Sequence, residues 1–319
     1  MFVFEEQEIR KYISINREII EQIEGGFTKL ARQEVNLPPV LRMDFPLYDG
    51  EVDVKTAYVQ GMASFAIKIS SGFFQNHILG LPSLSGMMIL LSAKTGLTEA
   101  FLLDNGYLTD VRTAAAGAVA ANYLAKEQVD VAGVIGTGMQ AKVQVEALYL
   151  VRPFKKLIVF GRNRENAERY RKEMESKLPV KIIMAESVEE VVRKSDVVVT
   201  TTPSTEPLIR AEWLHSGLHI TAIGSDAEHK QEIDPLIFQK VDVVVCDVKE
   251  QSFRLGELHH AKEEIEMADV LELGEITAKQ KLGRVNDQQI TICDLTGTGV
   301  QDTVCANYAF NLLKKAAHL

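Results

Sequence analysis

The sequence lacks the features that mark nucleic-acid-binding or membrane proteins. Lysine and arginine number 35 against 44 aspartate and glutamate residues, which gives a net charge of −9, and no dense basic cluster occurs. Nucleic acid is therefore not expected as a main partner. No apolar stretch reaches the roughly 18 residues that a bilayer crossing needs, and the start MFVFEE lacks the basic residues of a secretory signal. We expect a cytoplasmic protein without a membrane partner.

Cysteine is also scarce, which bears on both disulfides and metal binding. The three cysteines, Cys246, Cys293 and Cys305, are unevenly spaced in apolar surroundings. This pattern predicts reduced core residues in a reducing compartment. The histidines include one adjacent pair, His259 and His260, but no ligand-spaced cysteine or carboxylate set accompanies it. No metal site is expected.

One stretch of the chain carries a nucleotide-binding motif. Residues 129–144 read VDVAGVIGTGMQAKVQ, an apolar run that breaks into Gly136, Thr137, Gly138, Met139, Gln140 and Ala141 before helix-forming residues resume. Gly136 permits a tight turn, Gly138 allows backbone to approach a pyrophosphate, and the small Ala141 lets the helix lie close to the sheet. The free N–H groups at the start of that helix would face the phosphates.

The flanking segments give this motif its context. Five apolar runs follow and alternate with charged, helix-compatible segments: LIVFG (157–161), VKIIM (180–184), DVVVTTT (196–202), HITAIG (219–224) and VDVVVCD (241–247). Val/Ile-rich runs of this kind indicate a parallel sheet covered on both faces. The fold class is therefore α/β, with a Rossmann doubly wound parallel sheet that binds a dinucleotide.

The region after the second expected strand bears on the choice of cofactor. A domain that prefers NAD usually has a carboxylate there to bind the adenosine ribose, but this chain has Arg162, Asn163 and Arg164. A permanently charged guanidinium suits a 2′-phosphate. NADP(H) is therefore favoured and NAD(H) stays possible, since both arginines could be ordinary solvated residues at a helix start, next to Glu165.

The remaining chain predicts a second domain. Residues 14–33 read as an amphipathic helix with Ser14 as its N-cap, and short alternating runs from residue 38 to 104 suggest an antiparallel or mixed sheet. An Ala-rich helix (113–126) leads directly into the nucleotide strand. Beyond a helix-like run (270–281) and a final strand (290–295), the segment 302–315 reads as a terminal helix that returns to the first domain. The nucleotide domain is thus expected to be inserted into a discontinuous one.

Four charged residues are candidates for chemistry. Arg42, Lys68 and Arg112 interrupt apolar surroundings, where each could bind a carboxylate or a carbonyl, although a lone basic residue is often only ion-paired. Asp226 follows an apolar strand, where the crevice of an α/β sheet binds ligands, so it could act as a general acid or base. Asp226 could equally cap a following helix whose solvated face would carry Glu228, Lys230 and Glu232.

A resemblance to a known family joins these features. The chain resembles the ornithine cyclodeaminase/µ-crystallin family along nearly its full length, through the segments PPVLRMD, IKISSGFFQNHILGLPSLSGMMILLSAKTG, LTDVRTAAAGAVAANYLA, GVIGTGMQA, ITAIGSDAEHKQEIDP and DLTGTGVQD. The resemblance implies a discontinuous α+β substrate-binding and dimerisation domain (1–115 and 297–319) around an NAD(P)-binding Rossmann domain (116–296). It also implies a homodimer.

The resemblance further implies roles for particular residues. Arg42, Lys68 and Arg112 would bind the substrate, with Lys68 and Asp226 as catalytic residues. The cofactor would contact the glycine loop, Arg162 to Arg164 and three further residues: Thr202, Thr298 and Gly299.

The resemblance also narrows the activity. Members share hydride transfer between the nicotinamide and the α-carbon of an amino or imino acid. The segment after Lys68 resembles the alanine dehydrogenase-like and imino-acid reductase branch more than the YVNGHP-like sequence of ornithine cyclodeaminases, and GSDAEHKQE resembles the cyclodeaminase-like proteins of ectoine breakdown, for which iminosuccinate is a candidate substrate. An NAD(P)H-dependent imino-acid reductase or amino-acid dehydrogenase is favoured. Conversion of ornithine to proline is the alternative, followed by a non-catalytic µ-crystallin-like binding protein.

Overall fold

The computed structural model describes residues 1–317 and divides into two compact units. Unit 1 comprises residues 1–112 together with the chain from residue 298 onward, and unit 2 comprises residues 113–297. The chain passes from one unit to the other within helix α3 (Tyr107–Leu124). Among residues 1–317, no helix is both long enough and apolar enough to cross a bilayer.

Unit 1 is built on a mixed seven-stranded sheet. The strand order is β1-β7-β6-β5-β4-β2, with β3 also paired to β4. The pair β1–β7 is parallel, and the other neighbours are antiparallel. The strands are β1 (Phe2–Glu5), β2 (Val35–Asn36), β3 (Leu41–Phe45), β4 (Gly50–Val59), β5 (Ser64–Phe73), β6 (Leu84–Ser92) and β7 (Thr98–Leu103).

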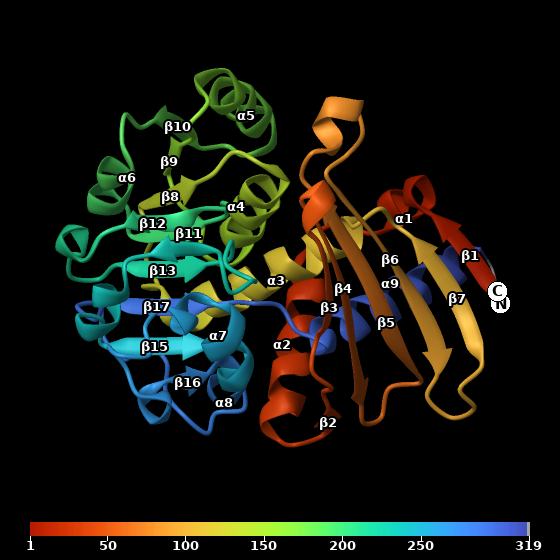
Figure 1. Ribbon diagram of the computed structural model, residues 1–319. Helices are drawn as coiled ribbons and strands as arrows, with labels where there is room; N and C mark the ends of the chain where they lie inside the picture. The colour runs from red at the N-terminus through yellow and green to blue at the C-terminus, as the bar shows by residue number, and fades with distance from the viewer. Residues whose placement is uncertain (318–319) are drawn as a thin grey trace. The chain divides into compact units, whose positions relative to one another are not determined.

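Helices cover this sheet from both ends of the chain. The last helix, α9 (Gly299–Ala316), packs on β4 and β5 and against α2 (Arg17–Ala31) (Figure 1). The first helix is α1 (Glu6–Tyr12), and two short 3-10 helices are η1 (Pro46–Tyr48) and η2 (Asn76–Leu79). The N-cap of α2 is Asn16, whose side chain accepts a hydrogen bond from the backbone N–H of Ile19. The expected N-cap Ser14 was wrong because the helix begins two residues later than its apolar stripe suggested.

Unit 2 contains the predicted parallel sheet. Its strand order is β10-β9-β8-β11-β13-β17-β15-β16, and every neighbouring pair is parallel (Figure 1). The order reverses between β8 and β11, which is the switch point where Rossmann folds bind ligands. The strands are β8 (Val131–Ile135), β9 (Lys156–Phe160), β10 (Lys181–Met184), β11 (Val197–Thr200), β13 (His219–Ala222), β15 (Val243–Cys246), β16 (Leu271–Glu272) and β17 (Thr291–Asp294).

The connections of unit 2 include helices and a second small sheet. The strands β12 (Thr205–Ile209) and β14 (Gln231–Ile233) pair in parallel. The longer helices are α4 (Met139–Val151) and α5 (Arg164–Lys177), and the shorter ones are α6 (Val188–Lys194), α7 (Lys249–Leu255), α8 (Leu273–Thr277), η3 (Ala211–Trp213), η4 (Pro235–Gln239), η5 (Glu257–His259) and η6 (Met267–Asp269). The helix-like run 270–281 is therefore a short strand followed by one helical turn of α8.

Candidate functional site: a glycine loop and a buried charge cluster

The glycine loop of unit 2 forms the turn between β8 and α4. Gly136 has a φ of +117°, and a Cβ there would lie 2.4 Å from the Thr201 hydroxyl oxygen, so the position needs glycine. Gly138 is the N-cap of α4, and a Cβ at that position would meet no atom within 4 Å. Ala141, in the first turn of α4, is fully buried. The loop thus leaves open space directly at a helix N-terminus, as a phosphate requires.

A cavity of about 470 Å³ opens beside this loop. It is lined by the ends of β8 and β9, by the segments that follow β8, β9 and β11, and by β12: Ile135, Gly136, Thr137, Gly138, Phe160, Gly161, Arg162, Asn163, Asn166, Thr201, Thr202, Pro203, Ser204, Thr205, Glu206 and Leu208. Met139 and Gln140 lie in the first turn of α4. The structure therefore brings most of the predicted cofactor residues of unit 2 together, and adds the segment after β11.

The three residues after β9 have different positions. Arg162 is exposed and lines the cavity, and Asn163 lines it while its side chain caps α5 by accepting from the N–H of Asn166. Arg164 instead lines a separate surface hollow with Glu165, Glu168, Arg169 and Lys172. Arg162 is therefore the guanidinium that can reach a ligand in this cavity.

Glu232 is a buried carboxylate that sequence reasoning missed. It lies on β14 with no exposed surface and accepts hydrogen bonds from the Thr200 hydroxyl (2.6 Å), the Thr202 N–H (2.6 Å) and hydroxyl (2.7 Å), and the Gly224 N–H (2.9 Å). Burial raises the pKa of Glu232, and the hydrogen bonds from the two threonines oppose that shift. This carboxylate ties together the segments that carry Thr202 and Asp226.

Asp226 lies in the turn after β13. Its carboxylate is 38% exposed and accepts a hydrogen bond of 2.7 Å from the Lys230 ammonium. The chain from Asp226 runs through a turn into β14 and forms no helix, while Lys230 and Glu232 are both buried. The interpretation of Asp226 as the cap of an exposed helix was therefore wrong. An accessible carboxylate next to a cation can donate or accept a proton.

Unit 1 contains a buried charge cluster formed by Lys68, Arg112, Gln301 and Asp302. Lys68 comes from β5, Arg112 from α3, and the other two from the first turn of α9. Asp302 contacts the Lys68 Nζ at 3.4 Å and the Arg112 Nε at 2.9 Å, and the Gln301 Oε1 accepts a hydrogen bond of 2.8 Å from the Arg112 Nη1. All four residues are at most 5% exposed. The structure thus brings the predicted Lys68 and Arg112 together and adds Gln301 and Asp302.

The environment of Lys68 changes its protonation. Burial lowers the pKa of Lys68 to about 7, with a further contribution from the Arg112 charge, while Asp302 acts in the opposite direction. Asp104, which is also buried, has its pKa raised to about 6 by desolvation. A lysine with a pKa near neutrality can change its charge in response to a bound ligand.

The third predicted basic residue has different partners. Arg42 on β3 forms ion pairs with Asp44, Glu51 and Asp53. In the antiparallel register, Asp53 lies directly opposite Arg42. Arg42 therefore lies among carboxylates on β3 and β4, and the cluster is organised around Lys68 and Arg112.

Thr298 and Gly299 form the start of α9. Thr298 is fully buried, and among residues 1–317 its hydroxyl has no hydrogen-bond partner. At Gly299, a Cβ would lie 2.1 Å from the Thr56 carbonyl oxygen, so the close packing of α9 on β4 by itself requires a glycine there.

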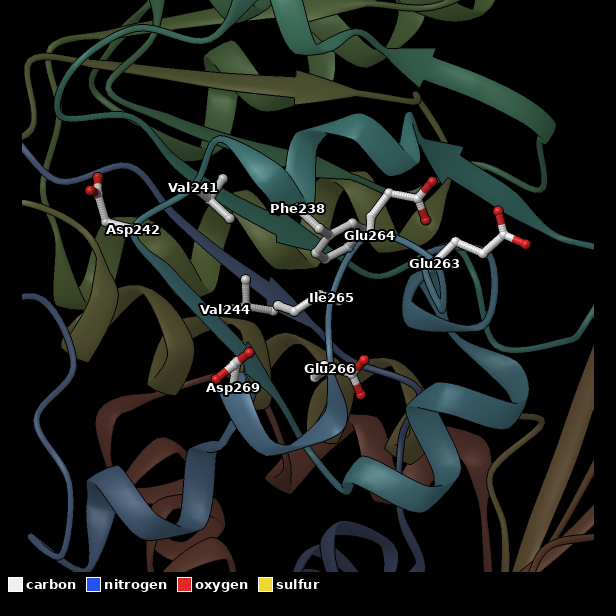
Figure 2. Close-up of a pocket in the computed structure, with 9 residues that line it drawn as sticks. All are labelled: Phe238, Val241, Asp242, Val244, Glu263, Glu264, Ile265, Glu266 and Asp269. Atoms are coloured by element: carbon white, nitrogen blue, oxygen red, sulfur yellow. The ribbon is translucent and has the colours of Figure 1, made fainter.

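A second hollow of unit 2 has the opposite charge character. Figure 2 shows Phe238, Val241, Val244 and Ile265 at its centre, with five carboxylates around them: Asp242, Glu263, Glu264, Glu266 and Asp269. Such a lining repels an anionic dinucleotide. In the described part of the chain, no group of three or more His, Cys, Asp or Glu side chains could hold a metal ion. Of these two hollows in unit 2, the cavity beside the glycine loop has the lining that suits a dinucleotide.

The family model described as the ornithine cyclodeaminase/mu-crystallin family matches residues 2–316. A protein of Rhizobium meliloti (strain 1021), provisionally named as a dehydrogenase, is 50% identical over 97% of this chain and 95% of its own length.

Two solved structures are similar over nearly the whole chain. One is the Δ1-pyrroline-2-carboxylate reductase of Thermococcus litoralis in complex with NADH and L-proline, at 30% identity and a TM-score of 0.94, covering 99% of this chain and 98% of that one. The other is an archaeal alanine dehydrogenase dimer with bound NAD, at 33% identity and a TM-score of 0.91, covering 99% and 97%.

Proposed function

The chain belongs to the ornithine cyclodeaminase/mu-crystallin family, and on this premise we propose that it is an NAD(P)-dependent oxidoreductase acting on a small imino or amino acid. The observation that carries the proposal is the buried pair of Lys68 and Arg112, in a chain that also has the glycine loop. When bound, the nicotinamide exchanges a hydride with the substrate's α-carbon. The chain's own residues bind the acid and balance the proton.

The substrate is held through its carboxylate. Arg112 offers a planar fork of N–H donors to the carboxylate, and Lys68 adds a second donor that is buried and close by. Arg42 is the third substrate contact that we propose, in addition to its three carboxylate partners. Fixing the acid in this way orients the carbon that reacts.

Asp226 supplies the proton when an imine is reduced and removes it when an amine is oxidised. Its partly exposed carboxylate and its hydrogen bond from Lys230 suit a group that must exchange protons. Lys68 is the second catalytic residue, because an ammonium with a pKa of about 7 can donate to the developing charge.

The dinucleotide is bound by the glycine loop, Met139 to Ala141, Arg162, Asn163 and Thr202, with Thr298 and Gly299 as further contacts, whereas Arg164 lines a separate hollow. NADP(H) is the preferred form, because Arg162 lines the cavity where a carboxylate would select NAD. The two solved relatives hold NADH and NAD, so NAD(H) is the alternative. The ratio of kcat/KM for NADPH and NADH decides between them.

The active form is a homodimer. Large apolar side chains of unit 1 are exposed on β3, η1, η2 and β6: Leu41, Met43, Phe45, Leu47, Tyr48, Ile78, Leu79 and Leu84. Exposed apolar residues in such numbers mark interaction surfaces. The archaeal alanine dehydrogenase of the comparison is a dimer. Sedimentation at several protein concentrations measures the mass.

The test is a substrate screen in which oxidation of NADPH or NADH is monitored by the absorbance at 340 nm. Pyruvate, glyoxylate and oxaloacetate are each offered with and without ammonia or methylamine, alongside Δ1-pyrroline-2-carboxylate and other cyclic imines. We expect ammonia-dependent turnover of a keto acid or direct reduction of an imine. Formation of proline from ornithine with every reduction failing would instead establish cyclodeamination.

The Asp226→Asn variant separates an enzyme from a ligand-binding protein. It removes the proton donor but should leave the dinucleotide affinity unchanged, so turnover is lost while binding persists. A wild-type protein that binds the dinucleotide but turns over no substrate in the screen would support the binding-protein alternative.

A further inference from the structure

We propose that Asp302 is the positioning residue of the carboxylate site, which fixes Lys68 and Arg112 as one pair with a single net positive charge. The inference rests on the proposed function of that pair. Asp302 lies in the first turn of α9 and has no exposed surface. None of the motifs in the sequence assigned it a role.

The contacts place Asp302 between the two cations. One carboxylate oxygen lies 3.4 Å from the Lys68 Nζ, and the other lies 2.9 Å from the Arg112 Nε. The Arg112 contact is ionic without an aligned hydrogen bond. Gln301 holds the same guanidinium from the neighbouring position through the hydrogen bond that it accepts from Nη1. The first turn of α9 therefore sets the position of both donors.

The charges explain why a carboxylate is needed. Lys68 is surrounded by Lys55, which lies directly opposite it on β4, by Arg112 from α3, by Asp104 after β7 and by Asp302 from α9. Burying like charges together is unfavourable, and burial itself disfavours an ammonium. With Asp302, the Lys68–Arg112 pair keeps one net positive charge, which matches one substrate carboxylate.

The sign of the pH dependence follows from these charges. Asp302 raises the pKa of Lys68 against the effects of burial and of Arg112, so removing its charge lets Lys68 lose its proton at a lower pH. A carboxylate ligand needs that proton. The alkaline limb of binding and of kcat/KM should therefore shift to lower pH when Asp302 is neutralised.

The experiment compares Asp302→Asn, Asp302→Glu and the control Glu263→Gln, which removes an exposed carboxylate of unit 2. The readouts are KM and kcat from pH 6 to 10 with the substrate identified in the screen, L-proline binding in the presence of NADH, and NADH affinity alone. We expect Asp302→Asn to raise KM and the L-proline Kd at least about tenfold and to move the alkaline limb down by about one pH unit. Asp302→Glu should partly restore both values, with NADH affinity unchanged throughout.

Two results would overturn the proposal. One is an Asp302→Asn protein whose KM and alkaline limb match those of the wild type and the Glu263→Gln control. The other comes from a double-mutant cycle on unfolding with Lys68→Met: additive effects would mean that Asp302 does not act through Lys68. The cycle needs no ligand. It therefore still tests the coupling between Asp302 and Lys68 when the wild type neither reduces imines nor binds L-proline, a result that would refute only the proposed function.

Discussion

The glycine loop of unit 2 and the charge cluster of unit 1 present positive charge in different ways. The loop occupies the three consecutive residues 136–138 and leads into the N-terminus of α4, whose backbone N–H groups lie at the edge of an open cavity. The cluster joins buried side chains from β5, α3 and α9, and its opposite charges stabilise one another. A site of the first kind depends on local conformation, and one of the second kind depends on tertiary contacts. Substitutions in the loop should therefore change the dinucleotide Kd, and substitutions in the cluster should change kcat/KM.

The largest effect is expected for Lys68→Met, which removes one cation of the cluster and keeps most of the length of the side chain. Truncating one partner of a buried charge pair costs several kcal/mol, so kcat/KM should fall about 10³-fold. The dinucleotide Kd should not change. Steady-state kinetics and fluorescence titration with NADPH measure both quantities, and a loss of less than tenfold would show that the cluster does not bind the substrate.

Gly136→Ala tests the loop through the dinucleotide Kd and the melting temperature. Because its φ is +117° and a Cβ would meet Thr201, strain of about 1 to 3 kcal/mol is expected, with a dinucleotide Kd raised about 10- to 100-fold. Gly138→Ala is the matched control, since its Cβ meets no atom within 4 Å and the melting temperature should stay the same. If both variants unfold at the wild-type temperature, an alanine at position 136 does not introduce the strain that the structure implies.

Arg162→Gln sharpens the question of the cofactor. If Arg162 binds the 2′-phosphate, the preference for NADPH over NADH in kcat/KM should fall about tenfold. Arg164→Gln is the control, because Arg164 lines a separate hollow. Equal losses in both variants would point to the general charge of the surface instead of a specific contact.

The smallest effect concerns Asp294, a buried acid at the end of β17 in unit 2. Burial raises the pKa of Asp294 to about 8, well above its usual value, so the folded protein holds a proton that the unfolded chain releases. Stability from this proton is lost as the pH rises through 8. Relative to Asp294→Asn, which stays neutral, the wild type should lose about 1 kcal/mol of unfolding free energy between pH 7 and 9. Urea unfolding at both pH values measures the difference, and a constant difference would contradict it.

Much of the fold could be predicted from local patterns. The strands of the Rossmann sheet appear as apolar runs, since a parallel sheet buries both faces, and the terminal helix appears from its own residues. The capping residue of α2 and the short strand β16 were missed, because element ends depend on tertiary contacts as much as on propensity.

The site was predicted in part. Lys68 and Arg112 stand out because each is a charge within an apolar segment. Glu232 was read as exposed because its neighbours Glu228 and Lys230 are charged, yet it is fully buried with four hydrogen bonds. Asp302 and Gln301 gave only the weak signal of two polar residues near the start of a helix that carries other polar residues as well.

The amino-acid sequence by itself determined the glycine loop, the parallel strands and the family, because these depend on residues that are neighbours in the chain. Only the tertiary structure decided that Lys68 and Arg112 share one carboxylate, that Arg42 pairs elsewhere, and that Asp226 is held by Lys230 in a turn. The physical reason is that the energy of a charge depends on what surrounds it in space. That environment is assembled from segments that lie far apart in the chain.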